Sequence, residues 1–180
     1  SRYERCPGAP GVGHHALLGG LLQHTTEVAS IARHIARVAR ADENLVIAGA
    51  LLHDIGKLES YTWEEGVFDT TIKGRLIGHV VLGAMMLRER IAASSDLPAT
   101  EEEVMLIEHM ILSHHGKLEF GSPVRPMTLE AEILSFADDT SAKTASINEA
   151  YGSPEYFPEG AQLSTKKLWQ LDNRFLYRKT

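Results

Sequence analysis

The hydrophobic positions of the chain recur every three or four residues over several long stretches, which is typical of amphipathic α-helices. The clearest stretch places one histidine among apolar residues on a single helix face: Leu21, His24, Val28, Ile31, Ile35 and Val38. A second helix is expected from Asp42 or Glu43 through the apolar run 45–52. Gly56 is expected to end that helix in a left-handed conformation. These patterns indicate an all-α fold.

Three more helices are expected further along the chain. The third carries Leu76, Val80, Gly83, Leu87 and Ile91 on one face. Thr100 and Glu103 form a capping box for the fourth helix, and Thr128 caps the fifth, which runs to about Ala150. The fourth helix is marked by Val104, Ile107 and Ile111, and the fifth by Leu129, Ile133 and Leu134.

The segments between these helices are rich in turn-forming residues. Residues 1–13 are expected to be a loop, 14–150 one helical-bundle domain, and 151–180 a weakly structured extension that packs on the bundle. Residues 57–74 look irregular, and two short β-prone stretches around Glu65-Gly66 could form a small hairpin near 61–70. Residues 116–127, with Pro123 and Pro126, read as a loop.

Composition narrows the class of protein. The chain has 180 residues, a net charge of −6 and one cysteine, Cys6. It therefore has no disulfide framework and no cysteine-based zinc site. The negative charge argues against gripping nucleic acid by bulk charge alone. No apolar run is long enough to span a bilayer, and the first residues have no signal-peptide pattern, so we expect a cytoplasmic location.

Nine histidines stand out, and several ionisable residues fall on faces that should be buried. A buried and unpartnered imidazolium or carboxylate costs several kcal/mol, so these groups need partners or a metal ion. One shared site in the bundle explains them together. The inward-facing candidates are His24, His53, Asp54, His79, His114, His115 and Asp138. His34 and His109 fit ordinary structural roles, and His14 and His15 are expected in a loop or at a rim.

Imidazole and carboxylate ligands suit Mn, Fe, Co, Ni or Zn. The number of candidates favours two divalent ions, with one aspartate able to bridge them, and such a pair activates water for attack on phosphorus. Asp54 and Lys57 are the candidate catalytic residues. Lys57 would contact a phosphate or clamp the bridging carboxylate, unless it is simply a solvated lysine. Three more cations are candidates for substrate binding: Arg75, Lys117 and Arg125.

An isolated His, a His-Asp pair and a distant Asp form a pattern that resembles the HD superfamily of metal-dependent phosphohydrolases. Here these residues are His24, His53-Asp54 and Asp138. Longer strings, namely GGLLQH (19–24), LLHDIGK (51–57), GH (78–79), ILSHHG (111–116) and GSPVRPMTLEAEILSFAD (121–138), resemble the HD domain of the YhaM-type 3'-to-5' exoribonucleases over roughly residues 13–150. The resemblance implies that His24, His53, Asp54 and Asp138 hold a first ion. Asp54 would bridge to a second ion at His79 and His114, with His115 nearby.

The resemblance also implies hydrolysis of phosphate esters in nucleotides or short single-stranded RNA. Two features depart from the family pattern. No OB-fold segment precedes the HD-like residues, so a partner chain or an oligomer would supply RNA binding. Ser141 stands where the family tends to carry an acid. Three alternatives stay open: a nucleotide phosphomonoesterase or triphosphohydrolase, a non-catalytic metal-stabilised nucleotide-binding module, and a plain helical bundle with structural histidines.

Overall fold

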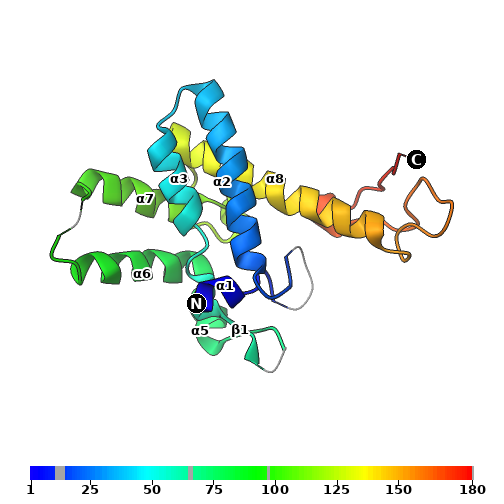
Figure 1. Cartoon of the computed structure of the whole chain (residues 1–180), viewed down its shortest axis with the longest axis horizontal. Coiled ribbons are helices and arrows are strands. Elements are labelled where there is room, and N and C mark those ends of the chain that lie inside the picture. The colour runs from blue at the N-terminus through cyan, green and yellow to red at the C-terminus, as the bar shows by residue number, and fades with distance from the viewer. Residues whose placement is uncertain (11–14, 65–66, 97, 180) are drawn as a thin grey trace.

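Two long helices, α2 (Gly20–Ala39) and α8 (Leu129–Gly152), cross and pack at the centre of the computed structural model, which describes residues 1–10, 15–64, 67–96 and 98–179 (Figure 1). Helix α3 (Glu43–Leu52) packs against both of them. Helix α7 (Glu101–Ser113) packs against α3 and α8, and α6 (His79–Ala92) lies beside α7. The expected all-α class is confirmed.

Short elements fill the connections. They are α1 (Arg2–Arg5), α4 (Lys57–Ser60), β1 (Tyr61–Thr62), β2 (Asp69–Thr70), α5 (Ile72–Ile77) and the 3₁₀ helices η2 (Leu118–Phe120) and η3 (Trp169–Leu171). Strands β1 and β2 pair antiparallel, with Tyr61 opposite Thr70 and Thr62 opposite Asp69. This confirms the small hairpin, although its expected turn at 65–66 lies outside the described residues.

Side-chain caps begin the helices where the sequence predicts. Asp42 accepts hydrogen bonds from the backbone amides of Asn44 and Leu45 at the start of α3. Thr100 and Glu103 form the reciprocal capping box of α7, and Thr128 accepts from the amide of Ala131 in α8. These bonds satisfy amides that have no partner within the helix.

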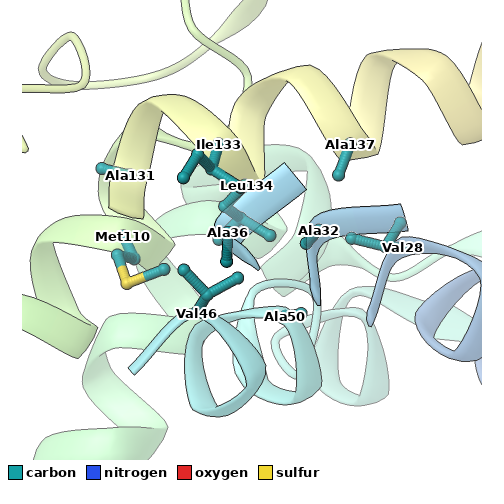
Figure 2. Packing of buried hydrophobic residues seen from close by; sticks show 10 residues of the cluster. All are labelled: Val28, Ala32, Ala36, Val46, Ala50, Met110, Ala131, Ile133, Leu134 and Ala137. Carbon is teal, nitrogen blue, oxygen red and sulfur yellow. The ribbon is translucent and has the colours of Figure 1, made fainter. Parts of the chain in front are cut away.

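The apolar core is formed where α2, α3, α7 and α8 meet (Figure 2). Its members are Val28, Ala32, Ala36, Val46, Ala50, Met110, Ala131, Ile133, Leu134 and Ala137. The small alanines let the helix backbones approach closely. The expectation that Val38 belongs to this face is wrong, because its side chain is 87% exposed. Ala32 and Ala36 face the core in the C-terminal half of α2 instead.

The expected helix around Leu76–Ile91 is two helices, and the expected irregular segment 57–74 contains α4 and the start of α5. Gly78 separates α5 from α6 with φ of +82°, a conformation that suits glycine. Leu76 therefore lies on a different helix from Val80, and it is 80% exposed. The spacing from Leu76 does not explain why His79 points inward.

Gly56 does not end α3 in a left-handed conformation. Helix α3 stops at Leu52, and Gly56 has φ of −65° and ψ of −14°. A β-carbon at Gly56 would lie 1.9 Å from the carbonyl oxygen of His79. Glycine is needed here because the 53–57 turn and the start of α6 are in close contact.

The chain ends also differ in detail from the expectation. Helix α1 occupies part of the segment expected to be a loop, and its capping box is formed by Ser1 and Glu4. The C-terminal extension lies beside the end of α8 (Figure 1). Ala150, Leu168 and Leu171 form a small apolar cluster there. Within the described residues, no helix combines the length and apolar character that crossing a membrane requires.

Candidate metal centre

Asp54 lies at the centre of a group of buried polar side chains. It sits in the turn after α3, and 3% of its side chain is exposed. Its Oδ2 atom lies 3.5 Å from His24 Nε2 and 3.3 Å from His53 Nε2. Its Oδ1 atom lies 3.4 Å from His79 Nε2 and 3.7 Å from His114 Nε2. Each carboxylate oxygen therefore faces a different pair of imidazoles.

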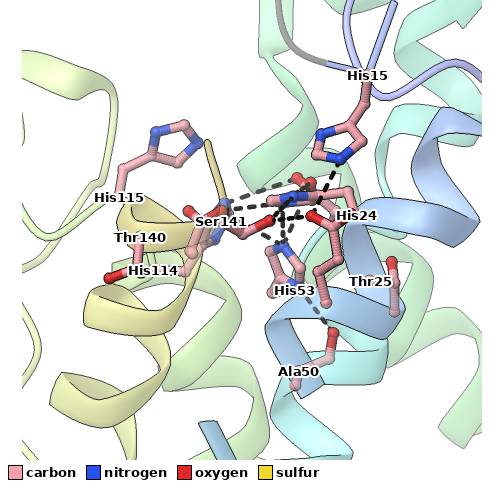
Figure 3. Close-up of polar contacts among 12 residues, drawn as sticks. His15, His24, Thr25, Ala50, His53, His114, His115, Thr140 and Ser141 are labelled. Carbon is pink, nitrogen blue, oxygen red and sulfur yellow. Dashed lines mark hydrogen bonds and ion pairs between the residues drawn. The ribbon is translucent and has the colours of Figure 1, made fainter. Parts of the chain in front are cut away.

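On the Oδ2 side, His24 from α2, His53 from the end of α3 and Asp138 from α8 can direct ligand atoms to one point. We call these three residues the Asp138 cluster. His24 Nε2 lies 3.0 Å from Asp138 Oδ1 and 3.3 Å from His53 Nε2. Figure 3 shows His24 and His53 converging from α2 and α3.

On the Oδ1 side, His79, His114 and His115 form a second group, which we call the His115 cluster. His79 is the first residue of α6, and the two other histidines follow α7. The Nε2 atoms of His79 and His115 are 3.1 Å apart. Segments distant in the sequence thus meet around Asp54, as the sequence predicts.

Backbone contacts fix the orientation of two of these imidazoles. The Nδ1 atom of His53 donates to the carbonyl of Ala50, and that of His114 donates to the carbonyl of Ile111, both at 2.7 Å. In the neutral rings Nε2 is then an acceptor that points into the centre.

The pKa shifts favour ionised carboxylates and the neutral form of three imidazoles, those of His24, His79 and His114. For His53, the neighbouring Asp54 carboxylate outweighs burial and raises the pKa. Burial opposes ionisation of Asp54, but the positive charges of Lys57 and protonated His53 and a hydrogen bond from His53 outweigh it and hold its pKa well below the usual range. Burial also opposes ionisation of Asp138, yet a hydrogen bond from His24 lowers its pKa. Burial lowers the pKa of His79 to about 4 and that of His114 well below its usual value. Neutral imidazole is the form that binds metal ions.

The donor set fits divalent cations. Asp54 Oδ1 and His114 Nε2 are buried and have no hydrogen-bond partner among the described residues. Imidazole nitrogens also face each other at 3.1 and 3.3 Å, where lone pairs repel unless a proton or a cation lies between them. Nitrogen and oxygen ligands of this kind suit first-row transition metals.

Lys57 is buried rather than solvated. Its Nζ atom lies 2.6 Å from Asp54 Oδ2, and 9% of its side chain is exposed. Although burial disfavours the charged amine, the Asp54 carboxylate raises the pKa of Lys57 above its usual value. The geometry is that of a clamp on the central carboxylate.

The other candidate cations lie further out. Arg75 pairs with Asp69 at 2.9 Å and does not line the described cavity at the centre. The Lys117 ammonium lies 5.2 Å from the ring centroid of Phe120, and Arg125 is exposed in the loop before α8. Of the remaining histidines, His34 is exposed and His109 accepts a hydrogen bond from the amide of Met127. Neither belongs to the two clusters around Asp54. His14 lies outside the described residues.

The sequence patterns missed three residues near the centre. His15, expected at a rim, is 2% exposed, and its ring centroid is 5.3 Å from that of His24. Glu27 lies beside Ser141, behind His24. Phe120 lines the cavity of about 160 Å³ that also contains Asp54, Lys57 and His114. Helical spacing carries no signal for His15 or Phe120, because both lie outside the long helices.

The helices bring a His-Asp pair, further histidines and a distant aspartate to one place, which defines a helical domain with a metal site. Residues 21–143 match the HD domain family. The chain belongs to this family. It is 36% identical to the 3'-5' exoribonuclease YhaM of Bacillus velezensis over 96% of this chain and 52% of the relative. It is also 36% identical to the 3'-5' exoribonuclease YhaM of Bacillus subtilis, over 93% and 51%.

The chain spans about half the length of these two curated relatives. Among solved structures, it is similar to the HD domain of the Listeria monocytogenes phosphodiesterase PgpH. That match has a TM-score of 0.50 and 25% identity, and it covers 69% of this chain and 67% of the other. These findings confirm the resemblance stated from the sequence.

Proposed function

We propose that this chain is a metal-dependent phosphodiesterase that hydrolyses nucleotides or short single-stranded RNA, with release of nucleotides from the 3' end. The observation that carries the proposal is Asp54, whose two oxygens face the Asp138 cluster and the His115 cluster. The relatives named as exoribonucleases and the PgpH phosphodiesterase support this reaction class.

Two divalent ions would be held by the Asp138 cluster and the His115 cluster, with Asp54 between them. Mn, Fe, Co, Ni and Zn all suit this set of ligands. Such ions polarise phosphoryl oxygens and activate water for attack on phosphorus. Lys57 would hold Asp54 in the orientation that serves both clusters, and its ammonium would offset negative charge near the substrate phosphate.

Phe120 would bind a nucleobase next to the phosphate. Its side chain is 58% exposed and lines the cavity that contains Asp54 and Lys57. Bases stack on exposed aromatic rings with little dependence on sequence. The Lys117 ammonium near the ring would favour the neighbouring phosphate, and Arg125 and Arg75 are proposed as more distant contacts. Further RNA binding would come from another segment or a partner chain.

Activity can be tested by stripping the protein with chelator, reloading it with each of the five metals, and adding a 5'-labelled oligoribonucleotide. We expect stepwise shortening from the 3' end and release of nucleoside monophosphates. Asp54→Asn and His24→Gln should each reduce turnover by more than about 100-fold, since they remove proposed metal ligands.

His34→Gln is the matched control, because this exposed histidine lies on the same helix as His24. It should leave turnover within about twofold, as expected for a surface substitution. Release of free phosphate from a nucleotide panel, without cleavage of RNA, would instead identify a phosphomonoesterase or triphosphohydrolase. Stoichiometric metal binding without turnover of either substrate would contradict the proposal and favour a binding module.

A further inference from the structure

On the side of His24 that faces away from Asp54, Ser141 contacts the imidazole and Glu27 contacts Ser141. Ser141 lies three residues after Asp138 on α8 and is fully buried. Its Oγ atom is 3.1 Å from His24 Nδ1 and 2.9 Å from the Oε2 atom of Glu27. Glu27 lies three residues after His24 on α2. Figure 3 shows Ser141 beside His24, across the α2–α8 interface.

The direction of these hydrogen bonds follows from the groups themselves. An ionised carboxylate only accepts, so the Ser141 hydroxyl donates its one proton to Glu27. The Ser141 oxygen is then available as an acceptor for His24 Nδ1–H. Without a metal ion, His24 Nε2 also shares a proton with Asp138, 3.0 Å away. Because Ser141 keeps a proton on Nδ1, a cation that replaces the Nε2 proton meets a neutral ring whose Nε2 lone pair faces Asp138 and His53.

Glu27 is itself held in place by several donors. Its Oε2 atom lies 3.1 Å from His15 Nε2, and its Oε1 atom accepts from Gln23 Nε2 at 3.0 Å. Partial burial opposes ionisation, but the hydrogen bonds from Gln23, Ser141 and His15 lower the pKa of Glu27. His53 and His114 are oriented by neutral backbone carbonyls, whereas His24 is linked to a carboxylate.

We propose that Glu27 and Ser141 are positioning residues that hold His24 in the tautomer and orientation that present Nε2 to a metal ion. They thereby set the metal affinity of the Asp138 cluster. Partners of this kind typically change metal affinity by about 10- to 100-fold. The inference rests on the proposed metal site, but it does not depend on which substrate is hydrolysed.

The test compares Mn²⁺ affinity of the whole chain, measured by competition with a chelator, in Ser141→Ala, Glu27→Met and Glu27→Gln. We expect Ser141→Ala and Glu27→Met to weaken binding by about 10- to 100-fold. Glu27→Gln should have an intermediate effect, because its amide oxygen can still accept from Ser141. The double variant Glu27→Met/Ser141→Ala should be no weaker than the worse single variant, because both break one chain of contacts.

Two matched controls come from helix α8, and one of them also lines a surface groove next to Glu27. Ser146→Ala removes another buried serine hydroxyl of α8, which bonds within its own helix to the carbonyl of Ala142. Glu149→Gln removes an acidic charge that lines the same surface groove as Glu27. Both should bind Mn²⁺ within about twofold of the unsubstituted protein, as expected for sites away from the ligands.

A second measurement separates positioning from a purely structural role. In the positioning variants, the Mn²⁺ concentration for half-maximal RNA hydrolysis should rise by about 10- to 100-fold, while turnover at saturating Mn²⁺ changes by less than about threefold. A folding defect would lower the active fraction without this shift. Unchanged affinity in Ser141→Ala and Glu27→Met would overturn the inference. Metal binding by the unsubstituted protein without RNA hydrolysis would overturn the proposed function alone.

Discussion

At the scale of single residues, the strongest charge interaction on Asp54 is its ion pair with Lys57. Both side chains are at least nine-tenths buried, and their charged atoms are 2.6 Å apart. A buried charge that loses its partner is strongly unfavourable. The stability of the metal-free protein should therefore depend on Lys57 more than on any exposed lysine.

In protein stripped of metal ions with a chelator, Lys57→Met should lower the free energy of unfolding by about 3–5 kcal/mol. The pKa of Asp54 is lowered on folding, so this carboxylate stabilises the fold above its unfolded pKa of about 3.9 and loses that contribution as the pH falls. Urea unfolding at about pH 7 and at about pH 3, below the unfolded pKa, measures both effects. Lys143→Met, which breaks an exposed pair with Asp139, is the control and should cost at most about 1 kcal/mol. Equal losses in the two variants would contradict the prediction.

Cys6 should behave as an inert thiol. It is fully buried, and burial raises the pKa of its thiol to about 12. Iodoacetamide at pH 8 should therefore modify the folded protein far more slowly than the urea-unfolded chain, as mass spectrometry can show. An unfolded thiol titrates near pH 8.5, so the raised pKa makes stability fall as the pH rises from about 8.5 toward 12. Cys6→Ala should remove that part of the alkaline loss, and equal labelling rates would refute the assignment.

Among the elements, the turn between α3 and α4 connects the two halves of the centre. It carries His53, Asp54 and Lys57, and Gly56 brings it against the backbone of His79. The position of the His115 cluster relative to Asp54 thus depends on a backbone contact that a side chain would prevent.

Gly56→Ala should lower the free energy of unfolding by about 3 kcal/mol, because its β-carbon would lie 1.9 Å from the His79 carbonyl oxygen. Its backbone angles already suit alanine, so the cost comes from crowding alone. Gly152→Ala at the end of α8 is the control, since a β-carbon there meets nothing within 4 Å. Denaturant melts of both variants provide the measurement. A neutral Gly56→Ala would show that the two segments can separate freely.

Helix η2 brings Phe120 to the cavity, and this placement gives a substrate-level prediction. Phe120→Ala should raise the KM for short RNA by about 10-fold and leave kcat within about threefold, because a stacked base is worth about 1–3 kcal/mol. Phe120→Trp should restore the KM. Leu118→Ala, which removes another exposed apolar side chain from the same turn, should change little. Steady-state kinetics on an oligoribonucleotide measure all three, and an unchanged KM in Phe120→Ala would exclude stacking.

The sequence predicts the elements well where periodicity and caps act locally. Asp42, Thr100 and Thr128 begin helices as expected, and the pattern of His24, His53-Asp54 and Asp138 locates the centre. The errors occur where tertiary contacts decide. Gly78 divides a continuous apolar pattern, and Gly56 is needed for a contact with a distant backbone. His15 reaches the centre with φ of +60°, which helical spacing cannot reveal.

At the scale of the whole molecule, the centre and the C-terminal extension occupy different parts of α8. Asp138 and Ser141 contact His24 of α2. Ala150 instead packs with Leu168 and Leu171, near the end of α8 where Figure 1 shows the C-terminal extension. The match to the HD domain family ends at residue 143.

Removal of residues 153–180 should therefore leave Mn²⁺ affinity within about twofold, since no proposed ligand is lost. The unfolding temperature should fall, because truncation exposes the apolar surface of Ala150 and Ile147. Isothermal titration and thermal melts of the truncated and full chains test both statements. Loss of metal binding with an intact helical spectrum would show that the extension supports the centre at a distance.

The shared position of Asp54 has a consequence for the order of metal loading. The Asp138 cluster adds a second carboxylate to the Asp54 oxygen it faces, and the Lys57 ammonium offsets only part of that charge, whereas the His115 cluster consists of imidazoles alone. Coulombic attraction therefore favours binding of the first cation at the Asp138 cluster. That cation then neutralises part of the negative charge that would attract the second one. Protein with one bound ion should therefore be a defined intermediate. The proposed activity would then rise in steps with metal concentration rather than in a single transition.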